Sequence, residues 1–115
     1  MGYYPVFLDI QGRKCCVVGG GGVAERKART LVSCGARVWV ISPRVTRGLL
    51  RMARSGKIVH ARCPYRAGML DQAFVVVAAT DDRAVNETVS RDCRARGMLV
   101  NVVDVPLESN FIVPA

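Results

Sequence analysis

The sequence contains no hydrophobic run long enough to cross a membrane as a helix. None of its apolar stretches approaches the roughly 18 residues that a membrane-spanning helix needs. The N-terminal stretch Met1–Asp9 also lacks the basic flank and the long apolar core of a signal peptide. We therefore expect a soluble, cytoplasmic protein that has no membrane partner.

Cysteine pairs of the kind that hold metals are also missing. The five cysteines are scattered, and no two of them form a C-x-x-C pair. An odd number without a second cluster argues against a zinc site, so we expect reduced thiols and no metal. Cys15 and Cys16 are adjacent in a predicted strand, where their side chains would point to opposite faces.

Acidic residues are scarce relative to basic ones. The chain has nine Asp and Glu against seventeen Lys and Arg, which gives a formal net charge of +8. Such a charge attracts polyanions, among them nucleic acids, membrane surfaces and acidic metabolites. However, the three Phe, three Tyr and one Trp do not alternate with basic residues as a nucleic-acid stacking platform requires. We therefore expect no nucleic-acid partner.

Strands alternate with helices along the chain, which at 115 residues has the length of one domain. Short apolar runs bounded by glycine or proline predict strands, and apolar residues at helical spacing predict the helices between them. This order predicts a Rossmann-like α/β fold, a doubly wound, mainly parallel five-stranded sheet with helices on both faces. The predicted strands are 14–20, 37–42, 57–62, 74–79 and 98–103. The predicted helices are 23–34, 47–54 after the cap residue Thr46, a short helix or turn at 67–72, and 83–96 after the cap candidates Thr80, Asp81 and Asp82.

Two regions carry more specific expectations. Phe74–Ala79 is a continuous apolar run of the kind found in parallel strands that are covered on both faces, so we expect it at the sheet centre. The last stretch, Asp104–Ala115, has an apolar segment at Phe111–Val113 between Pro106 and Pro114. It is expected to form a loop followed by a short extra strand.

A glycine-rich turn follows the first predicted strand and opens the first predicted helix. Gly19, Gly21 and Ala24 form the pattern G-x-G-x-x-A. In such a turn the first glycine permits a tight bend, the second lets a pyrophosphate approach the backbone, and the alanine keeps the helix close to the strand. The helix N-terminus then offers free N–H groups to the phosphates. The pattern in this context predicts a dinucleotide-binding site.

The end of the second predicted strand does not settle which dinucleotide is bound. The acidic residue that usually binds the ribose hydroxyls would lie there, about 20 residues after the glycines, and this chain has Ser42 instead. Ser42 can still form a hydrogen bond with a ribose, but Arg44 could instead contact a 2′-phosphate. The spacing therefore leaves both NAD and NADP open.

Ligands of open α/β sheets bind beyond the carboxyl ends of the strands, which selects further candidates. Asp104, after the fifth predicted strand, could act as a general base, or it could cap the turn before Pro106; the residues alone support both. Asp81 and Asp82 fit helix caps better, and His60 fits an ordinary strand residue. The segments expected to converge on this edge are Gly19–Val23, Ser42 and Pro43, Thr80 and Asp81, and Asn101–Asp104.

Three segments together resemble a known family. YPVFLDIQGRKCCVVGGGGVAERKARTL, VVVAATDDRAVN and LVNVVDVPLESNFIVPA are similar to the precorrin-2 dehydrogenase domain of siroheme synthases and cover nearly the whole chain. The resemblance implies NAD-dependent oxidation of precorrin-2 to sirohydrochlorin and, in many members, insertion of ferrous iron to give siroheme. It favours NAD over NADP, and it implies a tetrapyrrole substrate whose carboxylates the basic side chains could steer.

The resemblance also assigns residues. It implies NAD contacts at Gly22, Val23, Pro43 and Arg44, and it places the family's important aspartate at Asp104, which would assist proton loss during hydride transfer or during iron insertion. With the candidates from the sheet edge, the predicted site has Asp104 as its catalytic residue. Its predicted cofactor-binding residues are Gly19, Gly21, Gly22, Val23, Ser42, Pro43, Arg44, Thr80 and Asp81.

The resemblance implies differences from the family as well. Residues 1–115 would form the NAD-binding dehydrogenase domain without the helical dimerisation segment that follows it in relatives, and the full-length protein would be a homodimer. Ser109 and Asn110 stand where relatives commonly have Cys and Asp.

Two other functions stay open. The domain could be an NAD-binding regulatory sensor without catalysis, or an oxidoreductase acting on a small hydroxy or amino acid. The second lacks an obvious His or Lys base, because His60 is the only histidine and ends an irregular predicted strand.

Overall fold

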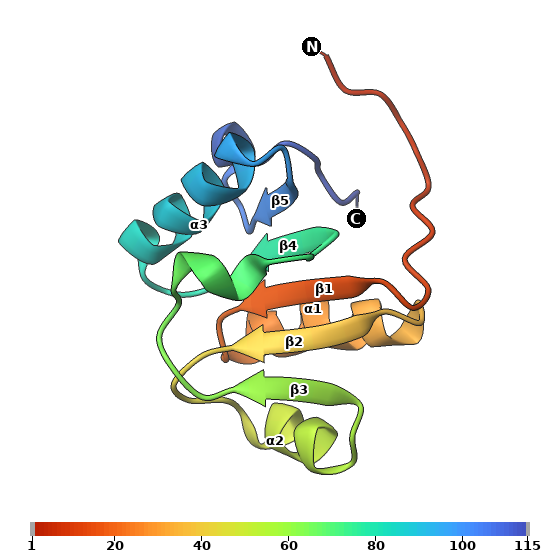
Figure 1. The fold of residues 1–115 in the computed structure, drawn as a ribbon, viewed down its shortest axis with the longest axis vertical. Helices are drawn as coiled ribbons and strands as arrows, with labels where there is room; N and C mark the ends of the chain where they lie inside the picture. Colours follow the sequence, from red (N-terminus) through yellow and green to blue (C-terminus); the bar gives the residue numbers. More distant parts are fainter. Residues whose placement is uncertain (1, 115) are drawn as a thin grey trace.

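The computed structural model describes residues 2–114 and shows a five-stranded sheet in which every strand pair is parallel (Figure 1). Positions 1 and 115, the ends of the predicted N-terminal and C-terminal stretches, lie outside the described residues. The strands are β1 (Lys14–Val18), β2 (Arg37–Ile41), β3 (Ile58–Ala61), β4 (Val75–Ala78) and β5 (Leu99–Val102). The α-helices are α1 (Gly22–Ser33), α2 (Arg47–Arg54) and α3 (Arg83–Ala95), and the 3-10 helices are η1 (Ala67–Leu70) and η2 (Pro106–Glu108). The predicted fold class is confirmed. Within residues 2–114, no helix is both long and apolar enough to cross a membrane.

The centre of the sheet is β1, so the prediction that the strand within Phe74–Ala79 lies there is wrong. The strand order is β3-β2-β1-β4-β5, which places β4 between β1 and the edge strand β5. The chain builds outward from β1 to β3, then crosses back and adds β4 on the free side of β1. A continuous apolar run reports burial on both faces, which β4 does have, but it does not report how many strands lie beyond it.

Helices cover both faces of the sheet, as predicted. On one face, Ala24 and Ala28 of α1 and Leu49 of α2 pack with Val17 and Val40 from the strands. The other face carries α3 and η1, and its core consists of Cys16, Val18, Ile41, Leu70, Ala73, Val76, Ala78, Val89, Cys93, Val100 and Val102. The strand residues of each core alternate along the chain because successive side chains in a strand point to opposite faces.

The adjacent thiols of Cys15 and Cys16 lie on opposite faces, as expected. Cys15 packs with Ile10 and Val75, while Cys16 belongs to the core beneath α3. Burial raises the pKa of Cys16 to about 11, and burial raises the pKa of Cys93 to about 11 as well. Both thiols are therefore protonated at neutral pH and pack as small apolar groups.

Side-chain caps begin two of the helices. The Thr46 hydroxyl accepts a hydrogen bond from Leu49 N at 3.1 Å and caps α2, as predicted. For α3 the cap is Asp82, which accepts from Ala84 N at 2.9 Å. Thr80 and Asp81 were candidates for the same role and do not fill it.

The expected extra strand after Asp104 is absent from residues 104–114; the chain there forms η2 and then an irregular run beside β5. Side chains of this run accept hydrogen bonds from the backbone N–H groups on the outer edge of β5. Val102 N donates to Ser109 Oγ at 2.8 Å, and Val100 N donates to Asn110 Oδ1 at 2.8 Å. Because a hydroxyl and an amide oxygen take the place of backbone acceptors, no sixth strand is needed to pair this edge.

The edge of β5 provides a stability test. We expect Asn110→Ala to lower the free energy of unfolding by roughly 1–3 kcal/mol, because the buried Val100 N–H loses its acceptor. Asn110→Asp keeps that acceptor and loses only the bond from Asn110 Nδ2 to Met98 O, so its loss should be smaller. Urea denaturation measures both variants. Equal stability of Asn110→Ala and the wild type would contradict this account of the edge.

Candidate functional site

The predicted site residues lie around one cavity of about 970 Å³ at the carboxyl end of the sheet. Each lies in a turn that follows a strand or, for Gly22 and Val23, in the first turn of α1, so the expected convergence is observed. Of the segment Asn101–Asp104, only Val103 and Asp104 line this cavity. The predicted residues that line it are Gly19, Gly21, Gly22, Val23, Ser42, Pro43, Arg44, Thr80, Asp81 and Asp104.

Gly19 makes the tight bend that ends β1. Its φ of 132° lies in the left-handed half of backbone space, which glycine adopts without strain. Ala79 is the residue that follows β4, and a Cβ on Gly19 would lie 2.5 Å from its carbonyl oxygen. The turn after β1 therefore packs directly on the turn after β4, and only glycine allows both the bend and the contact.

Gly20 makes the corresponding contact on the other side, and sequence reasoning missed it. A Cβ on Gly20 would overlap the Arg44 carbonyl oxygen, and Thr46 N donates to Gly20 O at 2.9 Å. In the pattern G-x-G-x-x-A this position accepts any residue, so the pattern assigns it no role. The sequence does mark this position, because Gly20 belongs to a run of four glycines, and the pattern G-x-G-x-x-A does not require a glycine there.

Gly21 and Gly22, in contrast, face open space. No atom lies within 4 Å of a Cβ built at either position. Gly21 begins α1 without a side-chain cap, whereas Ala24, one turn later, is fully buried against the sheet. The first turn of α1 therefore presents unblocked backbone N–H groups to the cavity, an arrangement that suits a phosphate.

The loop after β2 is held by its own hydrogen bonds. Ser42 Oγ donates to Arg44 O at 2.6 Å, and His60 Nε2 on β3 lies 2.8 Å from Ser42 O. The carboxylates that line the cavity, Asp81, Asp82 and Asp104, all follow β4 or β5, so none lies on this loop. Arg44 is exposed and forms no ion pair within the described part of the chain.

The turn after β4 is fixed by Asn86, a second residue that the sequence did not single out. Thr80 Oγ1 donates to Asn86 Oδ1 at 2.6 Å, and Asn86 Nδ2 donates back to Thr80 O at 3.1 Å. Asn86 is buried on α3, so this pair fastens the turn to the helix. Thr80 thus shapes the cavity wall with its hydroxyl already engaged, while Asp81 is exposed beside it.

Asp104 has the unusual backbone of the site. Its φ of 63° is left-handed, a conformation that Asp and Asn tolerate better than most residues. Its carboxylate is exposed and receives no hydrogen bond from residues 2–114, so the structure does not support the turn-capping role. A strained residue with a free carboxylate at a cavity is typical of a functional position.

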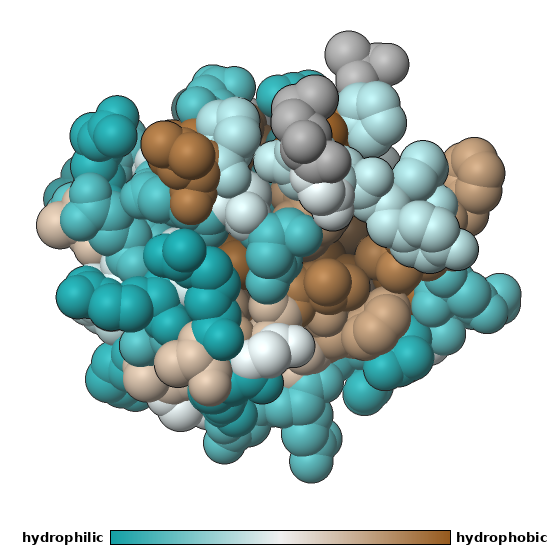
Figure 2. Space-filling view, turned by 90° about the horizontal axis from the view of Figure 1, so that it is seen from above, coloured by the Kyte–Doolittle hydropathy of each residue, from teal (hydrophilic) through white to brown (hydrophobic). Residues whose placement is uncertain are grey.

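A second cavity, of about 680 Å³, adjoins the first at Val103 and Asp104, which line both. Its floor is the face of β4 and β5 that carries Val75, Val77 and Asn101, and α1 forms one side of it through Arg26, Lys27, Thr30 and Leu31. The segment Phe111–Val113 forms one wall. Figure 2 looks down on the end of the molecule where β5 and this segment lie, and it shows hydrophobic side chains gathered in a hollow with hydrophilic ones around it.

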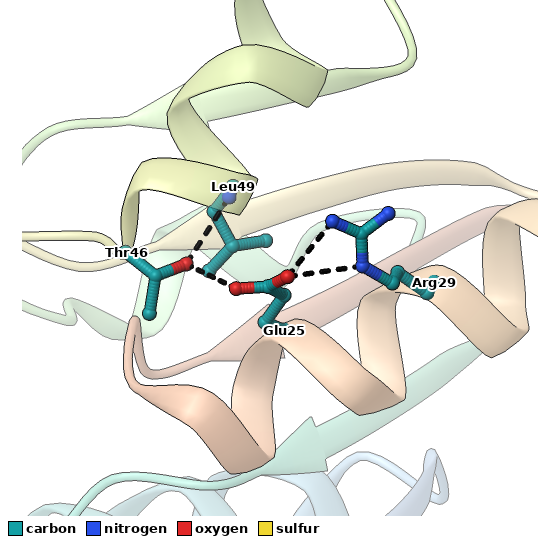
Figure 3. Close-up of polar contacts among 4 residues, drawn as sticks. All are labelled: Glu25, Arg29, Thr46 and Leu49. Carbon is teal, nitrogen blue, oxygen red and sulfur yellow. Dashed lines mark hydrogen bonds and ion pairs between the residues drawn. The ribbon is translucent and has the colours of Figure 1, made fainter.

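Glu25 joins α1 to the start of α2, as Figure 3 shows. Its Oε1 accepts from Thr46 Oγ1 at 2.6 Å, and its Oε2 accepts from Arg29 Nη2 at 2.8 Å. These hydrogen bonds hold the pKa of Glu25 below its ordinary value of 4.5. The bond from Thr46 has the largest effect on the pKa, and the bond from Arg29 has the next largest. A Cβ on Gly48 would overlap the Glu25 carboxylate, so glycine at that position makes room for the contact.

Comparison with protein families matches residues 6–115 to the family described as "Putative NAD(P)-binding". Among curated proteins, the chain is 44% identical over 115 residues to the siroheme synthase of Chromobacterium violaceum, and 44% identical over 111 residues to that of Methylobacillus flagellatus. These alignments cover 100% and 96% of this chain but 24% of each relative, so the chain spans about a quarter of their length.

Among solved structures, the chain is similar to SirC, a precorrin-2 dehydrogenase. The TM-score is 0.87 at 32% sequence identity, and the match covers 98% of this chain and 55% of that one. The similarity therefore extends over the whole arrangement of strands and turns that builds the two cavities.

The Glu25 network provides a test with a defined pH dependence. Because the pKa of Glu25 is lower in the folded state, its stabilisation is present above pH 4.5 and is lost as the pH falls through the lowered pKa. We expect Glu25→Gln to lower the melting temperature at pH 7 and to match the wild type in acid well below pH 4.5. Glu87→Gln, on the exposed surface of α3, is the matched control and should have little effect at either pH. A Glu25→Gln deficit of the same size at both pH values would contradict the network.

The two kinds of glycine can be separated by alanine substitution. Gly20→Ala places a methyl group against the Arg44 carbonyl and should destabilise the fold by roughly 1–3 kcal/mol. Gly21→Ala meets no neighbour and should leave stability within about 1 kcal/mol of the wild type, since this position is not left-handed. Thermal and urea denaturation measure both. Similar stability losses in the two variants would show that the turn is not packed as described.

Proposed function

Because the chain belongs to the NAD(P)-binding family that it matches from residue 6 to residue 115, we propose that it is the cofactor-binding part of an NAD-dependent dehydrogenase that oxidises precorrin-2 to sirohydrochlorin. A nicotinamide cofactor follows from the family. The substrate is our proposal, and it is supported by the similarity to siroheme synthases and to SirC.

One observation carries the proposal: a free, exposed carboxylate in a left-handed turn stands at the end of β5, where the cofactor cavity meets a second cavity. A dehydrogenase needs a cofactor site and a substrate site that adjoin, with a proton acceptor where they meet. Asp104 lies at that junction. A sensor domain requires only the first cavity, so the second cavity favours the enzyme.

The turns around the first cavity fit a dinucleotide. Gly21 and Gly22 would let the pyrophosphate approach the backbone N–H groups of α1, and Val23 would lie beside it. Ser42, Pro43 and Arg44 would bind the adenosine end, and Thr80 and Asp81 would line the opposite wall. We propose NAD as the preferred dinucleotide, on the strength of the family resemblance.

Bound NAD would supply the hydride acceptor. Oxidation of the macrocycle removes a hydride and a proton, and the two must leave by separate routes. The hydride would go to the nicotinamide ring, and Asp104 would take the proton from the macrocycle, for which it must be ionised when substrate binds. Its exposure keeps it open to solvent, so the proton can then be released to water.

Three finer proposals concern the longer proteins. Iron insertion, which the resemblance implies for many members, is proposed for them on that resemblance. Homodimer formation and a cytoplasmic location are likewise proposed on the family resemblance.

The cofactor site can be tested by thermal denaturation with NAD and NADP. A ligand that binds only the folded chain stabilises it by about 2.7 kcal/mol at a concentration a hundredfold above its dissociation constant. We expect a larger rise in melting temperature with NAD than with NADP. Gly21→Ala, whose methyl group would stand in the cavity, should lose most of that rise while keeping its own stability. If neither dinucleotide raises the melting temperature, the cofactor proposal fails.

Asp104 is tested by substitution with a residue that shares its backbone preference. Asp104→Asn keeps the tolerance for φ near 63° but removes the proton acceptor, so we expect turnover of precorrin-2 to fall at least about a hundredfold with NAD binding and stability retained. Formation of NADH under anaerobic conditions measures turnover. Wild-type turnover in Asp104→Asn would contradict the assignment. Binding of NAD without turnover in the full-length wild-type protein would favour the regulatory alternative.

A further inference from the structure

The second cavity carries an uncompensated positive charge on one rim. Of the residues that line it, the charged ones are Arg26 and Lys27 on α1 and Asp104 after β5. Neither Arg26 nor Lys27 is in either of the two ion pairs formed within residues 2–114. Two cations against one carboxylate leave the rim suited to a ligand with several negative groups.

Helix geometry separates this rim from the acidic side of α1. Glu25 and Arg29, four residues apart, lie on the side that contacts α2 and neutralise each other at 2.8 Å. Arg26 and Thr30 share the next row of the helix, and Lys27 and Leu31 share the one after it; all four line the second cavity. The only acidic side chain of α1 is thus turned away from the cavity and already paired.

The rest of the cavity is mainly apolar, with Thr30, Asn101 and Ser109 as its uncharged polar residues. Val75 and Val77 of β4 form its floor together with Asn101 of β5, and Phe111, Ile112 and Val113 form a wall. Asn101 Nδ2 donates to Phe111 O at 3.1 Å, which ties this wall to the floor. The volume of about 680 Å³ falls within the range of about 300–1,000 Å³ that is usual for small-molecule sites.

We propose that this cavity binds the tetrapyrrole, with the macrocycle against the apolar floor and its carboxylates on Arg26 and Lys27. The inference rests on the proposed function and deepens it, because it assigns carboxylate-binding residues among seventeen basic ones. A planar macrocycle with carboxylates around its edge matches an apolar floor with a cationic rim. Asp104, which lines both cavities, then stands between the macrocycle and the cofactor.

The test is a fluorescence titration of uroporphyrin I, a stable porphyrin rich in carboxylates, with the full chain. We expect the double variant Arg26→Ala/Lys27→Ala to bind about tenfold more weakly than the wild type. The matched control is Arg91→Ala/Arg94→Ala, which removes two exposed arginines from α3 on the opposite face and gives the same net charge. It should weaken binding no more than about twofold, because it changes only the long-range field.

A second ligand distinguishes binding through the carboxylates from nonspecific binding of the porphyrin ring. Mesoporphyrin has the same macrocycle with fewer carboxylates, so the difference between the two double variants should shrink with it. Equal weakening in both variants, or no binding of uroporphyrin by the wild type, would overturn the inference. The NAD-induced rise in melting temperature is measured in the same samples, so failure of the cofactor site is seen separately from failure of the carboxylate contacts.

Discussion

The close packing of three turns at the carboxyl end of the sheet is the constraint on which the site depends. Gly19 lies against the Ala79 carbonyl and Gly20 against the Arg44 carbonyl, so the turn after β1 is held between the turns after β4 and β2. Any side chain at either position would push these turns apart. Because α1 begins two residues later, this packing also sets where its N-terminus points. The glycine-rich segment is therefore a rigid part of the structure, and only its second half is free to meet a ligand.

Supporting contacts extend this rigidity outward from the turns. Thr46 accepts from Leu49 N while it donates to Glu25, so one hydroxyl caps α2 and ties it to α1. Asn86 fastens the turn after β4 to α3 with three hydrogen bonds to Thr80. In both cases a polar side chain is held by partners from another segment, which lowers the freedom of the cavity wall. Such preorganisation is what a site needs in order to hold two reactants in a fixed relation.

The two cavities differ in chemistry, and each suits one of the two proposed ligands. The first presents backbone N–H groups and polar side chains, which suit a dinucleotide. The second presents a mainly apolar floor with two cations that form no ion pair within residues 2–114, which suit an acidic macrocycle. Asp104 belongs to both, and its left-handed backbone lies in the turn that Val105 N closes by donating to Val102 O at 3.0 Å. Two of the chain's basic residues, Arg26 and Lys27, thus line the cavity whose ligand would be anionic.

The sequence by itself determined the order of strands and helices, the glycine turn and the residues after each strand, because these follow from local periodicity and from backbone preferences. It also indicated Asp104, through its place after an apolar strand and through the family resemblance. It could not show that β1 is central, that Gly20 meets Arg44, or that Ser109 and Asn110 cover the edge of β5. Nor could it show that Arg26 and Lys27 lie on the side of α1 that lines the same cavity as Asp104. Only the tertiary structure decided these points, because each depends on contacts between segments far apart in the chain, and no local pattern records which distant segments will meet.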